Sequence, residues 1–127
     1  MTVNVGLLQK TLETIKANPT HWNQKNWHCN SSHCFAGFTE LLYFGLPIYS
    51  NVETLRKDER IYDPIALHED FSWGTRNNAT NALGLTVEDA TLLFAGGNTL
   101  ADIESMVVHL VKFENLINWD YEANDDY

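Results

Sequence analysis

Apolar residues recur every three or four positions near the start of the chain, which is the spacing of one face of an α-helix. The stripe comprises Val5, Leu8, Leu12 and Ile15. It predicts a helix over residues 3–17 that ends at Asn18-Pro19. The helix ends there because proline cannot extend the hydrogen-bond ladder and restricts the residue before it.

A second apolar stripe predicts a helix over residues 33–44. Its members are Cys34, Phe35, Phe38, Leu41 and Leu42. Ser31 or Ser32 is the expected N-cap, since a hydroxyl can accept from a free backbone amide in the first turn. Gly45 marks the end of the helix. Gly37 lowers the intrinsic stability of the helix, and we interpret it as a place where another helix approaches closely.

The last third of the chain holds the clearest helix signals. Residues 75–83 predict a short helix, and Thr86-Val87-Glu88-Asp89 resembles the capping box of another, which ends at Gly96-Gly97. Thr99-Leu100-Ala101-Asp102 repeats that signal for a final helix. The final helix presents an apolar face to the core, made of Ile103, Val107, Leu110 and Val111.

These patterns together predict an all-α fold, a compact orthogonal bundle of about five helices with an irregular insertion over residues 46–73. A short helical turn is expected within the insertion at residues 52–57. The length of 127 residues is that of one domain. We therefore expect a single helical domain over residues 1–115 and an acidic C-terminal tail over residues 116–127.

The chain is strongly acidic, with 17 acidic and 8 basic residues and a formal net charge of -9. This charge repels nucleic-acid phosphates and anionic membranes, so we expect neither as a partner. Lys112 is the last basic residue, and the tail beyond it is interpreted as a frayed terminus or as a contact for a basic partner. No signal peptide and no membrane-spanning run is recognised, which predicts a cytoplasmic protein with reduced cysteines.

The segment from His28 to Cys34 holds both cysteines and two of the five histidines. In one interpretation Cys34 is a small buried hydrophobe on its helix. In a second, Zn²⁺ is bound by Cys29, His33 and Cys34, with His28 or His21 as the fourth ligand, because Cys29 and His33 have a spacing found in zinc sites.

A third interpretation makes Cys34 a reactive nucleophile, because a helix N-terminus lowers the pKa of a thiol. His109 or His68 is then the candidate base, and Cys29 the resolving thiol. The established motifs of nucleotide-binding proteins, serine hydrolases and zinc proteases are missing from the sequence. No catalytic residue is therefore assigned, and Cys34 stays the candidate nucleophile.

Two blocks of sequence carry a resemblance to known proteins. The first runs from Trp27 to Phe38, as Trp-His-Cys-Asn-Ser-Ser-His-Cys-Phe-Ala-Gly-Phe, and the second runs from Ala82 to Ala90 with Leu93-Phe94 after it. This pattern resembles a group of small uncharacterised bacterial, cyanobacterial and phage proteins. In that group a Trp-x-Cys-x-x-x-His-Cys-Phe-Ala-Gly segment is followed by a Leu-Gly-Leu-Thr helix start. The resemblance implies a helical fold and a phage or cyanobacterial source, and no particular activity.

We expect the chain to be a small, non-enzymatic protein-binding module, such as a phage-encoded regulator or inhibitor of a host protein. Small size, acidity and the missing catalytic motifs favour this class over an enzyme. The expected binding residues are aromatic: Trp22, Trp27, Trp119 and Tyr121. The alternative is a thiol-dependent or zinc-dependent enzyme centred on Cys29, His33 and Cys34. No cofactor is expected under the first hypothesis, and zinc under the second.

Overall fold

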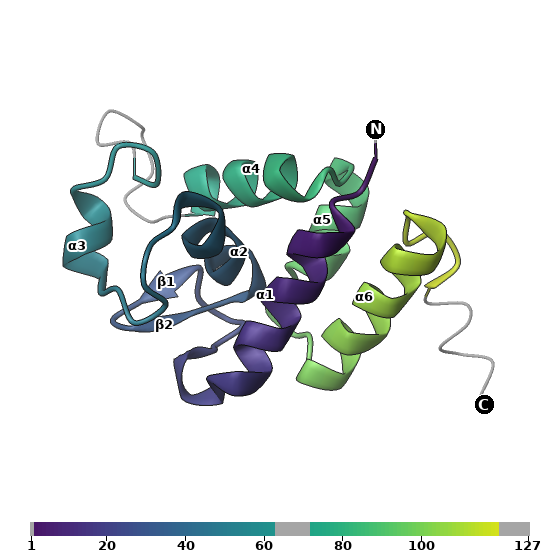
Figure 1. The fold of residues 1–127 in the computed structure, drawn as a ribbon, viewed down its shortest axis with the longest axis horizontal. Coiled ribbons are helices and arrows are strands. Elements are labelled where there is room, and N and C mark those ends of the chain that lie inside the picture. Colours follow the sequence, from purple (N-terminus) through teal and green to yellow (C-terminus); the bar gives the residue numbers. More distant parts are fainter. Residues whose placement is uncertain (1, 63–71, 120–127) are drawn as a thin grey trace.

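The computed structural model describes residues 2–62 and 72–119, which form a mainly helical domain (Figure 1). The described elements are, in chain order, α1 (Val5–Ala17), η1 (Pro19–His21), β1 (His28–Cys29), β2 (Ser32–His33), α2 (Phe35–Phe44), α3 (Val52–Arg56), α4 (Ser72–Leu83), α5 (Val87–Leu93) and α6 (Leu100–Phe113). The helical fold class is confirmed. The expectation of an all-α fold is corrected by the β1–β2 hairpin, whose second strand includes His33, the residue at which the second helix was expected to begin.

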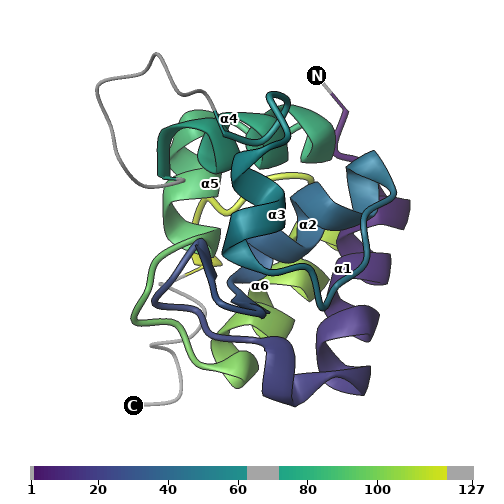
Figure 2. The same cartoon turned by 90° about the vertical axis from the view of Figure 1, so that its left-hand side faces the viewer.

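Helix α2 is the centre of the packing, between α1 on one side and α4 on the other (Figure 2). Helix α1 also contacts α6, so α1 lies between α2 and α6 (Figure 1). Phe35, Phe38 and Leu8 are among the largest fully buried side chains. Burial of such residues is the main term that stabilises a domain of this size.

The helix ends follow the sequence closely in most places. Asn4 is the N-cap of α1, with its side chain accepting from the amide of Leu7, and α1 ends at Asn18 as predicted. Thr99 and Asp102 form the complete capping box expected at the start of α6. The predicted turn at residues 52–57 is confirmed as α3.

Three local predictions were wrong. Cys34, and neither Ser31 nor Ser32, is the N-cap of α2, because the serines belong to the hairpin. Helix α5 ends at Leu93 rather than at Gly96-Gly97.

The third concerns Asp89, which does not complete the capping box of α5. Thr86 caps that helix alone with its hydroxyl. The Asp89 carboxylate instead accepts from the amide of Leu116 at 3.1 Å. Leu116 is buried and Trp119 packs against the same core. Residues at the start of the predicted tail are therefore part of the folded domain.

In the part of the chain that the structure describes, no helix is both long and apolar enough to cross a membrane. Tyr121, one of the expected binding residues, lies outside the described residues, as does the candidate base His68. Most of the acidic tail and part of the 46–73 insertion also lie outside them.

Candidate functional site

The β1–β2 hairpin brings His28 and His33 together. The two strands are antiparallel, and the register pairs His28 directly with His33. Asn30 makes the turn between them with a positive φ of 55°, a conformation that asparagine tolerates better than most residues. Directly opposite residues project to the same face of a hairpin, and the ring nitrogens Nδ1 of the two histidines lie 2.6 Å apart.

Glu40 of α2 extends this pair into a buried polar chain. Its Oε1 atom lies 2.8 Å from His28 Nε2, and both side chains are 0% exposed. Two groups of α4 also donate to the carboxylate, the Thr75 hydroxyl at 2.8 Å to Oε1 and the Asn78 amide at 2.6 Å to Oε2. Asn78 in addition donates to the backbone carbonyl of Arg60 at 2.6 Å. These hydrogen bonds thus connect the hairpin, α2, α4 and the segment after α3 to one buried carboxylate.

The hydrogen bonds constrain where the histidine protons lie. A carboxylate at Glu40 can only accept, so His28 Nε2 carries a proton. One proton then lies between the two Nδ1 atoms. When His28 is neutral, that proton belongs to His33, and His33 Nε2 is left as an acceptor.

His33 is held neutral by its surroundings. Its pKa is lowered from 6.5 to about 3, mainly because burial disfavours the charged ring. The charges of His28 and His21 lower the pKa further, and the Ile48 carbonyl partly offsets these effects. Within the described residues its Nε2 atom has no partner of hydrogen-bond geometry, although that carbonyl is near enough to act on the ring. His33 is completely buried, so in this conformation its free nitrogen cannot contact a substrate.

Cys34 has the environment of a structural cysteine. Its sulfur caps α2 by accepting from the Gly37 amide at 3.4 Å, and the side chain is buried. Burial raises the pKa of the thiol from 9.0 to about 12, against weaker opposing effects of the backbone amides of Gly37 and Ala36. Position in the first turn of a helix was expected to activate this thiol, but desolvation is the larger effect here.

The other candidate residues for metal or thiol chemistry make no contact that the structure gives with the hydrogen-bonded group of His28, His33 and Glu40. Cys29 is exposed at the tip of the hairpin, while Cys34 is buried. His109 lies on α6, where its Nδ1 atom is 2.8 Å from the carbonyl oxygen of Asn115. Among residues 2–62 and 72–119, no group of three or more histidine, cysteine or acidic side chains has an arrangement that could hold a metal ion.

The tryptophans expected to bind a partner are partly buried in the fold. Trp22 and Trp27 pack against the core, and Trp27 meets Phe94 edge to face with ring centroids 6.3 Å apart. Trp119 also packs against the core, and its indole nitrogen donates to the Ser105 hydroxyl at 3.0 Å. Each therefore has a structural contact that explains its position.

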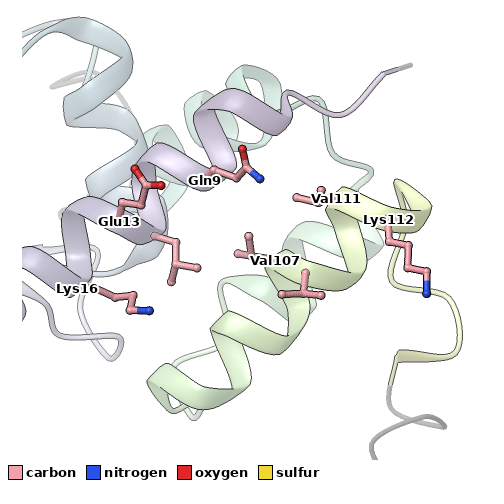
Figure 3. A pocket seen from close by; sticks show the side chains of 8 residues that line it. Gln9, Glu13, Lys16, Val107, Val111 and Lys112 are labelled. Atoms are coloured by element: carbon pink, nitrogen blue, oxygen red, sulfur yellow. The ribbon is translucent and has the colours of Figure 1, made fainter.

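An apolar groove lies between α1 and α6, and sequence reasoning did not identify it. Its volume is about 530 Å³. Leu12 of α1 and three valines of α6 line its floor, and the remaining lining residues are Gln9, Glu13, Lys16 and Lys112. Figure 3 shows Gln9, Glu13 and Lys16 projecting from α1 beside Val107 and Val111 of α6.

The two lysines lie at opposite ends of this groove (Figure 3). Lys16 is in the last turn of α1 and pairs with Glu104 of α6 at 3.5 Å. Lys112 is in the last turn of α6. The most exposed of the lining valines is Val108, at 65%.

Comparison with protein families, curated proteins and solved structures found no match to this chain. The fold thus holds two features of interest, the buried group of His28, His33 and Glu40 and the apolar groove between α1 and α6.

Proposed function

We propose that this protein is a small, non-enzymatic protein-binding module and that the groove between α1 and α6 is its binding face. The observation that carries the proposal is the exposure of Val108, 65%, in a groove whose floor is otherwise made of Leu12, Val107 and Val111. An apolar groove with polar ends suits the apolar face of a partner helix, which places side chains at every third or fourth position into it.

The electrostatics support a protein as the partner. A net charge of -9 disfavours nucleic acid and anionic membranes as partners. Buried apolar contacts at the centre of an interface contribute most of the binding free energy, while charges at its edge mainly affect the association rate. In this groove the aliphatic side chains would contribute most of the binding free energy. Glu13, Lys16 and Lys112 would mainly affect the association rate.

The buried environments of Cys34 and His33 weigh against the enzyme hypothesis. A nucleophilic cysteine needs a low pKa and access, whereas burial raises the Cys34 pKa to about 12. A module without catalytic groups acts by occupying a surface of its partner. Regulation or inhibition of the bound protein, in the cytoplasm and with a phage-encoded chain acting on a host, is the form of this activity that we propose.

The test compares two valines that differ only in position. Val108 lines the groove and is 65% exposed, and Val87 lies on α5 and is 64% exposed. Immobilised wild-type protein, Val108→Glu and Val87→Glu would each be incubated with lysate of the host cell, after circular dichroism has shown that all three are folded. We expect a partner that is captured by wild type and Val87→Glu and lost with Val108→Glu.

Equal capture by the two variants, or repeated capture of nothing that depends on Val108, would overturn the proposal. A photo-crosslinking residue at position 108 adds a second readout. It should form a covalent adduct with the same partner, and the same residue at position 87 should not.

A further inference from the structure

Three residues of α6, spaced four positions apart, form a row along the α1–α6 groove. They are Glu104, Val108 and Lys112. Residues four apart on a helix are neighbours on the same face. Val108 and Lys112 are exposed and Glu104 is partly exposed. The row therefore presents an acid, an aliphatic side chain and a base, in that order, to whatever covers this side of α6.

The order of the charges makes this row complementary to an antiparallel copy of itself. If two copies of α6 lie antiparallel about a two-fold axis at Val108, Glu104 of one copy lies opposite Lys112 of the other. Each of these residues is about 6 Å from the axis along its helix, and the symmetry forms the pair twice. A parallel arrangement would instead oppose Glu104 to Glu104 and Lys112 to Lys112, which is repulsive.

Within one chain, both charged residues of the row can still take a partner of opposite charge. The ammonium of Lys16 lies 3.5 Å from Oε1 of Glu104, and a carboxylate has a second oxygen that can accept from another base. Lys112 makes no ion pair in the part of the chain that the structure describes. Its ammonium lies 5.2 Å from the centre of the Phe113 ring. A second copy of the row would supply the carboxylate that Lys112 lacks.

The surface formed by the groove-lining residues and Glu104, which we call the α1–α6 face, has no net charge. It carries two acids and two bases, which are Glu13, Glu104, Lys16 and Lys112. The net charge of -9 therefore resides on the rest of the chain. Two copies that meet at this face bring neutral surfaces together and leave the acidic surfaces outside the contact, where solvent ions screen them.

The pair of helices has the form of one half of a four-helix bundle. The helices run antiparallel, because Lys16 in the last turn of α1 lies beside Glu104 in the first half of α6. They lie side by side in Figure 1, and no described element lies in front of them. Two such pairs placed face to face enclose their aliphatic side chains between four helices, as in other bundles. The side chains enclosed here would be those around Leu12, Val108 and Val111.

We propose that this protein forms a two-fold symmetric dimer in which Val108 of each α6 enters the α1–α6 groove of the other copy. Glu104 of each chain then pairs with the partner subunit's Lys112. The dimer covers the face on which we place the host protein, so the two exclude each other. The net charge opposes association, and the dimer is therefore weak enough for a partner to displace it.

Exchange of the charges tests the arrangement in purified protein, with sedimentation equilibrium as the measurement. Glu104→Lys leaves two bases in the row and Lys112→Glu leaves two acids, so each variant should dimerise more weakly than wild type by about tenfold or more. For Glu104→Lys this loss cannot come from overall repulsion, because the variant is less acidic than wild type. An equimolar mixture of the two variants should dimerise as wild type does, since every base then faces an acid. The double variant should do the same.

The matched controls test the apolar contact. Val108→Glu should abolish the dimer, and Val87→Glu, which adds the same charge on α5, should leave it largely intact. Circular dichroism establishes beforehand that all the variants are folded. The proposal would be overturned by a wild-type chain that stays monomeric up to about 1 mM, by a dimer that tolerates Val108→Glu, or by a mixture that does not recover.

These outcomes can be told apart from a failure of the proposed function. Sedimentation uses the purified chain and needs no host protein, whereas capture from lysate needs no dimer. A monomeric chain that still captures a partner through Val108 would overturn the dimer alone. A dimer with the expected charge dependence, together with no captured partner, would overturn the proposed function alone.

Discussion

Glu40 Oε1 lies 2.8 Å from His28 Nε2, and neither side chain is exposed to solvent. A carboxylate taken out of water is strongly destabilising unless it is hydrogen-bonded on several sides. Here His28, Thr75 and Asn78 all donate to it. The pair therefore holds the hairpin, α2 and α4 in one arrangement, and its removal leaves several buried polar groups without partners.

We predict that Glu40→Ala lowers the free energy of unfolding by about 3–5 kcal/mol, because it leaves His28 and the two α4 donors buried and unpaired. The matched control is Glu13→Ala, which removes an exposed glutamate within α1 and should change stability by less than about 0.5 kcal/mol. Urea unfolding of both variants measures the difference. Similar losses for the two variants would show that the buried carboxylate contributes no more than a surface one.

The second prediction concerns acid. The unfolded chain binds a proton at His33 below a pKa of 6.5, while the folded chain does so only below about 3. Between these values the unfolded state binds more protons, so stability falls as the pH is lowered, by up to about 1.4 kcal/mol per pH unit from this residue. At pH 4 the contribution reaches about 3 kcal/mol.

Other groups also titrate in this range, so the measurement is a difference between wild type and His33→Gln. Chemical unfolding at several pH values between 4 and 7 should give a shallower loss of stability for the variant. Parallel pH profiles for the two proteins would show that His33 does not contribute.

The third prediction concerns the thiols. Cys29 is exposed and should react with a thiol reagent in the native protein, whereas Cys34 should react only on unfolding. Its pKa of about 12, against 9.0 when unperturbed, means that the unfolded state loses this proton first as the pH rises above 9. Stability should therefore fall above pH 9. A native titration of Cys29→Ser checks the assignment, since any fast reaction that remains would come from Cys34 and would contradict its burial.

The helices were accessible from sequence because their signals are local. Periodic apolar residues and the Asn18-Pro19 stop mark α1, which ends where predicted, and the Thr99 capping box marks the start of α6. These features depend on neighbours within a few positions along the chain. Propensity and capping therefore predicted them without knowledge of the tertiary fold.

The hairpin and the polar chain depend on contacts between distant parts of the sequence. Gln24 shows this: its side chain accepts from the amide of Phe35 at 3.0 Å and donates to the carbonyl of Leu93 at 3.2 Å. No periodicity indicates such a residue. Glu40 left a weak signal, a single acid within the apolar sequence of α2. Its partners Thr75 and Asn78 lie more than thirty positions away, so a single sequence does not identify them.

At Gly37 the sequence correctly predicted a close approach to α2 but not which element approaches it. A close approach was expected at this glycine and is present, but the hairpin and the segment before it approach α2, and not another helix. A Cβ atom added at Gly37 would overlap the carbonyl oxygen of Trp27 and crowd the side chains of His33 and His28. The Cys-Phe-Ala-Gly sequence is thus explained as a cap followed by a contact site for the hairpin.

The last prediction uses this contact to separate backbone propensity from packing. Alanine in place of glycine within a helix ordinarily stabilises it, by about 0.4–1 kcal/mol. Gly6→Ala in α1 should show that gain, because the nearest atom to the added Cβ is Asn4 Oδ1 at 3.8 Å. Gly37→Ala should instead destabilise the domain by about 1–3 kcal/mol or more, since the overlapping atom belongs to the backbone.

Thermal unfolding of the two variants beside wild type measures the expected gain in stability for Gly6→Ala and the expected loss for Gly37→Ala. The Gly37→Ala variant should in addition shift the NMR signals of the His28 and His33 rings, because the hairpin has to move away from α2 to make room. The Gly6→Ala variant should leave these signals in place. A gain in stability for both variants would mean that the hairpin yields at little cost, and the close packing of Trp27 on α2 would then not be a determinant of this fold.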